Sequence, residues 1–149
     1  VAFAIQGESH MWLPSVRLLP SRRSEGLVIV RDLAVVGLGY VGLPLVFEAV
    51  HAGMSVVGYD VSQGVVDGLN GGVSHIDDLS DEQVRGLVEK GFRATSDPSV
   101  LGEAAHVVIC VPTPLAEDGG PDLGAVRAAV GDVARYLKAG QVIVLESTT

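Results

Sequence analysis

Three glycines, Gly37, Gly39 and Gly42, are spaced as G-x-G-x-x-G directly after an apolar run at residues 33–36. The first glycine of this spacing allows a tight turn, the second lets a ligand approach the backbone, and the third lets a helix pack closely on a strand. The backbone N–H groups at the start of that helix would point towards an anion. We therefore predict a loop that binds the pyrophosphate of a dinucleotide. Its residues are Gly37, Leu38, Gly39, Tyr40, Val41 and Gly42.

An acidic residue, Asp60, ends the next apolar run and follows Gly37 by 23 residues. The second strand of a strand–helix–strand unit should end at this distance, so the carboxylate can accept hydrogen bonds from an adenosine ribose. It would also repel a 2′-phosphate, which predicts NAD rather than NADP. The alternative is a purely structural turn, because the chain holds 19 glycines. The strand before the motif, the helix after it and the position of Asp60 favour the dinucleotide site.

Short apolar runs alternate with helical periodicity from residue 32 onward. This alternation predicts an α/β fold, a Rossmann-type doubly wound parallel sheet whose strands are joined by crossover helices. We expect strands at about 33–36, 56–59, 92–95, 107–111 and 142–145. The run at 107–111 is the most apolar, as a central buried strand should be. Helices are expected at about 41–52, 62–70, from 80 to 91, briefly from 97, and from 122 to 140.

Sequence signals at helix starts and faces refine this assignment. Ser80 with Gln83 resembles a capping box, and Asp122 can cap the last helix. Apolar residues at helical spacing should form one buried stripe on that last helix. They are Val126, Ala129, Val130, Val133 and Leu137.

The two ends of the chain differ from its middle. Residues 1–31 carry four arginines and two glutamates, whereas residues 32–149 carry six basic and sixteen acidic side chains. We interpret residues 1–31 as a flexible N-terminal extension, although an apolar cluster at 11–13 could dock elsewhere, and residues 32–149 as an NAD-binding domain. A six-stranded dinucleotide fold would continue after 142–145. We therefore expect a sheet truncated at its C-terminal end, without a central helix or substrate domain, and with a free edge that favours association.

Bulk properties restrict the class of protein. A net charge of −8 argues against nucleic acid or an anionic membrane as a partner. No apolar run approaches the length of a membrane span. The single cysteine, Cys110, excludes an internal disulfide and agrees with a reducing, cytoplasmic location.

Six motifs between Leu33 and Thr149 together resemble the UDP-glucose/GDP-mannose dehydrogenase family. They are Gly37–Pro44, Gly58–Asp60, Leu69–Gly72, Val111–Leu115, Pro121–Leu123 and Glu146–Thr149. The resemblance implies an NAD-dependent nucleotide-sugar 6-dehydrogenase, which oxidises a C6 alcohol to a carboxylate and reduces two NAD molecules. The tracts containing Pro112 and Asp122 are more similar to the branch that acts on UDP-N-acetylhexosamines than to the UDP-glucose branch. Full-length members commonly form homodimers and supply precursors for polysaccharide biosynthesis.

The resemblance also implies roles for single residues. The glycine loop and Asp60 would bind the pyrophosphate and ribose. Ser147 and Thr148 match a pair that lies against the nicotinamide ribose, and Thr148 matches a catalytic threonine that helps position the hydrolytic water. Without the resemblance, Thr148 could equally satisfy a backbone group at a strand end. The loop that crosses the nicotinamide half would comprise Val111, Pro112, Thr113 and Pro114.

One residue departs from the family pattern. Five residues beyond the ribose acid the family commonly has Lys or Arg, whereas this chain has Val65. A basic side chain there lies near the adenosine end of the cofactor, so we expect weaker affinity for NAD.

The family's chemistry uses a cysteine that forms a thiohemiacetal and then a thioester, and this cysteine lies in family segments beyond residue 149. Cys110 is no substitute, because it lies inside an apolar run and no base flanks it. We therefore expect these 149 residues not to oxidise a UDP-sugar by themselves. A non-catalytic cofactor-binding fragment of the family is the alternative. A hydroxyacyl- or phosphogluconate-type dehydrogenase fits the tracts at 111–115 and 146–149 poorly.

The remaining polar residues suggest no second centre. The four histidines are scattered without metal-ligand spacing, so we expect no metal site. They are His10, His51, His75 and His106. His51 should end a helix. The acidic pairs at 77–78 and 81–82 are typical of a solvated helix start.

Overall fold

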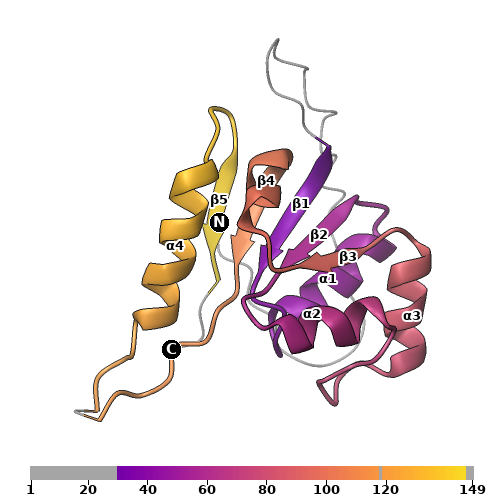
Figure 1. The fold of residues 1–149 in the computed structure, drawn as a ribbon, viewed down its shortest axis with the longest axis horizontal. Coiled ribbons are helices and arrows are strands. Elements are labelled where there is room, and N and C mark those ends of the chain that lie inside the picture. Colours follow the sequence, from indigo (N-terminus) through magenta and orange to yellow (C-terminus); the bar gives the residue numbers. More distant parts are fainter. Residues whose placement is uncertain (1–29, 118, 147–149) are drawn as a thin grey trace, which may run out of the picture.

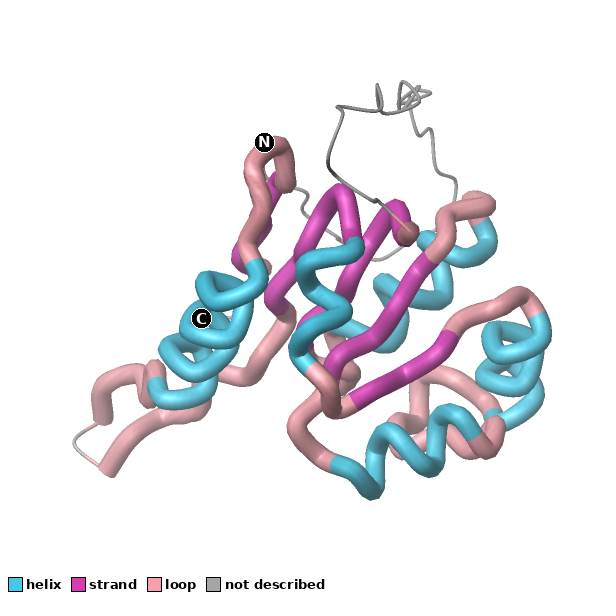
Figure 2. Tube along the Cα trace, turned by 45° about the horizontal axis from the view of Figure 1, so that its top comes forward, coloured by secondary structure: helices cyan, strands magenta, loops and turns pink. Residues whose placement is uncertain are grey.

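A five-stranded parallel sheet with helices on both faces forms the body of the molecule (Figures 1 and 2). The computed structural model describes residues 30–117 and 119–146. The strand order is β3-β2-β1-β4-β5, which confirms the doubly wound α/β fold. The strands are β1 (Arg31–Val36), β2 (Val56–Tyr59), β3 (Arg93–Thr95), β4 (Ala104–Ile109) and β5 (Val142–Leu145).

Within the described residues, four α-helices and one 3-10 helix connect the strands. They are α1 (Gly42–His51), α2 (Gln63–Asn70), α3 (Asp81–Glu89), η1 (Pro98–Glu103) and α4 (Gly124–Tyr136). The capping box is confirmed: the Gln83 N–H donates to the Ser80 hydroxyl, and the Ser80 N–H donates to the Gln83 side chain. Ser62 caps α2 by accepting from the N–H of Val65. His51 ends α1, as expected.

The alternation of side chains along each strand divides the core between the two faces. On one face, Leu33 and Val35 of β1 pack with buried residues of α1, α2 and α3. On the other face, Ala34 and Val36 pack with buried residues of η1 and α4, among them Ala129. The central strand β1 is therefore covered on both sides, which fixes the position of the loop that follows it.

Two strand boundaries differ from the expected ones. Strand β1 starts at Arg31, two residues early, because the backbone N–H of Asp32 donates to Ser55 and Arg31 pairs with Ala104. Strand β4 covers 104–109 rather than 107–111; it lies inside the sheet between β1 and β5, as expected, and β1 is the middle strand. Apolar runs predict the buried part of a strand but miss polar or small residues that pair at its start.

The last helix departs from expectation in its cap and its stripe. The N-cap residue is Leu123, with no side-chain cap, while Asp122 accepts a hydrogen bond from the N–H of Gly124. Ala129 and Val133 are buried, but Val130 is 47% exposed, and Leu137, beyond the last helical residue, is 52% exposed. The expected stripe is thus wrong at Val130 and Leu137, because the buried line of α4 is narrower than the apolar spacing indicated.

Strand β5 pairs only with β4 among the described residues, and all four of its side chains are exposed. The part of the chain that the structure describes holds no helix that is both long and apolar enough to cross a membrane.

Candidate functional site

A cavity of about 550 Å³ lies where the strand order reverses, at the carboxyl ends of β1, β2 and β4. Crevices at this switch point are where open α/β sheets bind ligands. Segments that are distant in the sequence line it: the glycine loop, the end of β2 with the start of α2, the turn after β4, one face of α4, and the single residues His75 and Glu146. The predicted site residues in the lining are Gly37, Gly39, Tyr40, Val41, Asp60, Val111 and Pro112.

The three glycines of the loop have distinct steric surroundings. Gly37 has φ +86°, and a Cβ there would lie 3.0 Å from the carbonyl oxygen of Cys110. A Cβ at Gly42 would overlap the carbonyl oxygen of Gly37. At Gly39 a Cβ would meet no atom within 4 Å, so its backbone opens onto the cavity. The first and third glycines shape the loop, and the second leaves room for a ligand.

The start of α1 suits an anion. Its N-cap residue, Val41, makes no side-chain hydrogen bond, and the first turn contains no acidic residue. The first N–H groups of a helix have no intrahelical acceptor, and the helix dipole adds positive potential there. Together with the open backbone at Gly39, this arrangement fits the pyrophosphate of a dinucleotide.

Asp60 follows β2 and connects it to the glycine loop. Its Oδ2 accepts the N–H of Leu38 at 2.9 Å, and its Oδ1 accepts the N–H of Ser62 at 2.9 Å. Each carboxylate oxygen keeps a further acceptor site for a ribose hydroxyl. The sequence did not reveal the contact with Leu38, which is itself fully buried and does not line the cavity. Asp60 therefore also holds the shape of the glycine loop.

The turn after β4 places only part of the predicted loop in the cavity. Val111 and Pro112 line it, whereas Thr113 and Pro114 do not. Beyond them the chain forms a small hairpin, in which Leu115 and Pro121 form a bridge and the N–H of Asp122 donates to Pro114 at 2.7 Å. Ser147 and Thr148 lie outside the described residues. Their neighbour Glu146 lines the cavity.

Cys110 is buried, as predicted, although it also borders the cavity. Burial and, to a smaller extent, the negative charge of Glu146 raise the pKa of its thiol to about 11. A thiol with this pKa stays protonated near neutral pH, so Cys110 is a poor nucleophile.

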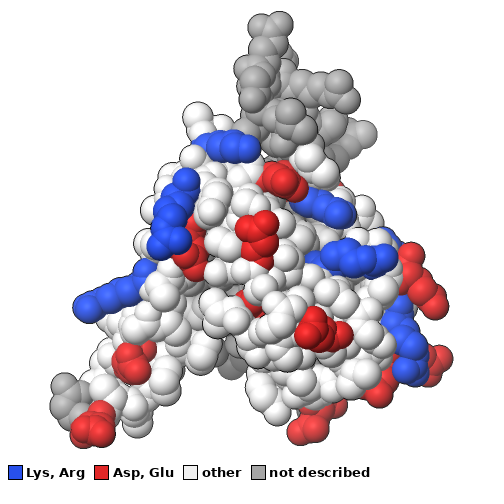
Figure 3. Space-filling view, viewed as in Figure 1, with Lys and Arg blue, Asp and Glu red and all other residues white. Residues whose placement is uncertain are grey.

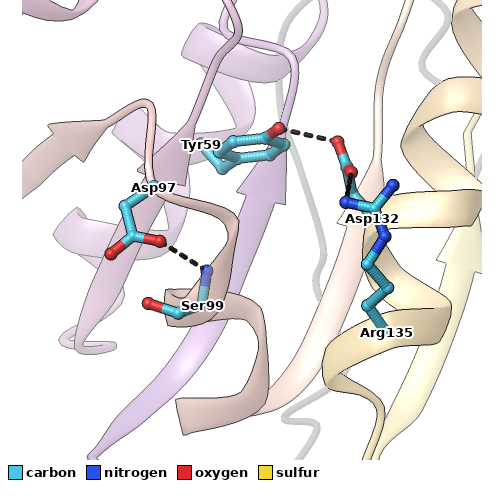
Figure 4. A network of polar contacts seen from close by, with 5 residues as sticks. All are labelled: Tyr59, Asp97, Ser99, Asp132 and Arg135. Carbon is cyan, nitrogen blue, oxygen red and sulfur yellow. Dashed lines mark hydrogen bonds and ion pairs between the residues drawn. The ribbon is translucent and has the colours of Figure 1, made fainter.

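A hydrogen-bonded group that the sequence did not reveal links β2 to α4. The hydroxyl of Tyr59 donates to Oδ2 of Asp132 at 2.7 Å, and Arg135 lies 3.2 Å from Oδ1 (Figure 4). Burial and, next, the hydrogen bond with Asp132 together raise the pKa of Tyr59 to about 12. Tyr59 is 73 residues from Asp132 in the sequence, so only the tertiary fold, in which α4 packs against η1 and β4, brings them together.

The charged side chains around the site do not form one large basic surface. Val65 lines the cavity together with Asp60, Asp132 and Glu146. On the face drawn in Figure 3, basic and acidic side chains of the described residues are interspersed rather than gathered in one basic surface. A dinucleotide would thus be held by backbone dipoles rather than by a field of cations.

Comparisons with known proteins agree with this geometry. Residues 31–149 match the model of the UDP-glucose/GDP-mannose dehydrogenase family, NAD binding domain. The chain is 42% identical over 122 residues to an NDP-N-acetyl-D-galactosaminuronic acid dehydrogenase of Ralstonia nicotianae, covering 80% of this chain and 28% of the relative. It is 40% identical over 119 residues to a UDP-N-acetyl-D-mannosamine dehydrogenase of Salmonella typhi, covering 78% and 28%.

A solved structure shows the same arrangement. The UDP-D-ManNAc dehydrogenase from Pyrococcus horikoshii superposes with a TM-score of 0.73 at 35% identity, over 78% of this chain and 28% of that one. The chain therefore spans a little over a quarter of the length of the relatives it matches.

Proposed function

The chain belongs to the UDP-glucose/GDP-mannose dehydrogenase family and is its NAD-binding domain, and from this premise we propose that it serves the oxidation of the C6 alcohol of a nucleotide sugar to a carboxylate. Bound NAD would supply the hydride acceptor for this reaction. The single observation that carries the proposal is the cavity at the strand switch point, which combines an open glycine backbone with an acid at the end of β2.

The substrate class we propose is a UDP-N-acetylhexosamine. Two observations support it: the tract with Pro112 resembles that branch of the family, and the relatives named above act on N-acetylated nucleotide sugars. We further propose that the full-length protein is a cytoplasmic homodimer that supplies precursors for polysaccharide biosynthesis.

Each site residue then has a proposed task. The N–H groups around Gly39 and the start of α1 hold the pyrophosphate, and Asp60 accepts hydrogen bonds from the adenosine ribose. Val111 to Pro114 border the nicotinamide half. Ser147 lies against the nicotinamide ribose, and Thr148 helps to position the water that releases the acid.

Replacement of Asp60 tests the binding function. In calorimetric titrations of the 149-residue chain, we expect saturable binding of NAD and weaker binding of NADP, because the carboxylate repels a 2′-phosphate. Asp60→Ala should weaken NAD binding by roughly tenfold or more, the value of a hydrogen bond to a charged group, and should narrow the preference over NADP.

The matched control is Asp77→Ala, which removes an exposed carboxylate outside the cavity. It should leave both titrations unchanged. A wild-type chain that is folded by circular dichroism but binds no NAD would overturn the proposed function. An unchanged NAD/NADP preference in Asp60→Ala would remove Asp60 from the ribose site.

A further inference from the structure

The cavity continues past Asp60 into a slot between the end of β2 and helix α4. The residues of α4 that line it follow the spacing i, i+3, i+4, i+7, so one face of the helix forms one wall. Three of them, Ala125, Ala128 and Ala129, are alanines, and Val61 and Val65 line the same cavity. Short apolar side chains leave a smooth surface that suits the face of an aromatic ring.

The fourth residue of that face, Asp132, is the only charged one. Its side chain is 18% exposed and lines the cavity. Tyr59 donates to one carboxylate oxygen and Arg135 lies beside the other, so the group is held in place from two sides (Figure 4). A carboxylate has about four acceptor positions, so these two contacts leave others available to a ligand.

Tyr59 determines where Asp132 lies relative to the rest of the site. It directly precedes Asp60, and its hydroxyl contacts Asp132 at 2.7 Å, so one residue joins the ribose acid to the far wall of the slot. A nucleoside whose ribose is held by Asp60 would direct its base either to solvent or into this slot. The apolar walls favour the slot, since they remove the base from water.

We propose that Asp132 is a specificity-determining residue that reads the adenine base by accepting a hydrogen bond from its exocyclic amine. This inference rests on the proposed function, because it requires a dinucleotide in the cavity. Adenine presents an N–H donor at the position where hypoxanthine presents a carbonyl oxygen. A fixed carboxylate attracts the first and repels the second, so the slot selects adenine.

The probes that test this are NAD and nicotinamide hypoxanthine dinucleotide, which share the ribose, pyrophosphate and nicotinamide groups. In titrations of the 149-residue chain, we expect wild type to bind NAD roughly tenfold more tightly, as for one hydrogen bond to a charged acceptor. In Asp132→Asn the ratio of the two affinities should fall towards one, because the amide side chain can accept a hydrogen bond from the amine of adenine or donate one to the carbonyl of hypoxanthine.

Two control variants distinguish a loss of base recognition from a general loss of structure or affinity. Asp77→Asn makes the same chemical change at an exposed position outside the cavity and should keep the wild-type ratio. Tyr59→Phe keeps the Asp132 carboxylate and should also keep the preference for NAD, even where both affinities fall. Circular dichroism and thermal melting establish that each variant is folded.

The possible outcomes test the inference about Asp132 separately from the proposed function. Equal affinity of wild type for both dinucleotides, or an unchanged ratio in folded Asp132→Asn, overturns the inference and leaves NAD binding intact. Equal weakening of both ligands by Asp132→Asn assigns the residue a structural role and overturns it too. Absence of NAD binding by the folded wild type overturns the proposed function itself.

Discussion

The first part of the molecule, from β1 to β3, and the second part, from β4 to β5, both consist of apolar strands and amphipathic helices. The two parts differ in how far their strands are buried and in whether their helices have side-chain caps. In the first part, β2 and the last four residues of β1 are buried, and two of the three helices have side-chain caps. In the second part, all four residues of β5 are exposed and α4 has no side-chain cap. Apolar residues alone do not produce burial, because burial also requires an element that packs on top of them.

The cavity lies at the boundary between these two parts. The first part supplies the glycine loop and Asp60, which are joined by the hydrogen bond from the Leu38 N–H to Asp60. The second part supplies α4, which reaches the cavity through a long-range hydrogen bond to Tyr59. We therefore expect substitutions in the first part to change stability and binding together, and matched substitutions in the second part to have smaller effects.

The largest contrast should be between two glycines in helices. Gly42→Ala places a Cβ against the carbonyl of Gly37, so it must displace the loop; we expect a loss of about 3 kcal/mol in the free energy of unfolding and loss of NAD binding. Gly131→Ala, inside α4 with no atom within 4 Å of its Cβ, should gain up to about 1 kcal/mol. Urea denaturation and NAD titration measure both.

The expected contrast between the two glycines is contradicted if Gly42→Ala and Gly131→Ala have the same free energy of unfolding. That result would mean that α1 can shift away from the loop without cost, and that the close approach of Gly42 to Gly37 is not required for the fold.

A second contrast concerns one valine from each part. Val35 is fully buried in β1, so Val35→Ala should cost about 2 to 3 kcal/mol through lost burial and a cavity. Val144 of β5 is 40% exposed, so Val144→Ala should cost less than about 1 kcal/mol. Chemical denaturation of the two variants under one set of conditions compares them directly. Equal costs would show that β5 is covered in solution, for example by a second copy of the chain, which sedimentation would detect.

The same contrast explains what the sequence could and could not predict. The capping box at Ser80, the end of α1 at His51 and the burial of Cys110 were all predicted, because each depends on a few neighbouring residues or on one apolar run. The exposure of Val130 was not, because helical spacing defines a face without saying what packs on it.

Within the site, the glycine loop and Asp60 were brought together as the spacing indicated. Asp132 was missed because its partner, Tyr59, is 73 residues away and no local pattern connects them. Thr113 was assigned to the nicotinamide loop by resemblance, yet it does not line the cavity. A motif fixes which residues are consecutive, whereas the direction of each side chain depends on the turn that the chain makes.

The smallest effect should appear at the hydrogen bond between Tyr59 and Asp132, one of the contacts between the two parts, as a dependence of stability on pH. Burial and Asp132 raise the pKa of Tyr59 from 10.0 to about 12 in the folded chain, so the unfolded chain loses this proton first as the pH rises. The contribution of the Tyr59 hydroxyl to stability is therefore complete below about pH 10 and is lost as the pH rises through about 12. We expect a decrease of about 1 kcal/mol or less, because the contact borders the cavity and water screens it.

Tyr59→Phe should be less stable at neutral pH and should lack this part of the decrease. Denaturation of both proteins between pH 9 and about 12 measures it. Parallel curves for wild type and Tyr59→Phe would show that the hydroxyl does not hold α4 in place, and that apolar contacts such as those of Ala129 and Val133 do so instead.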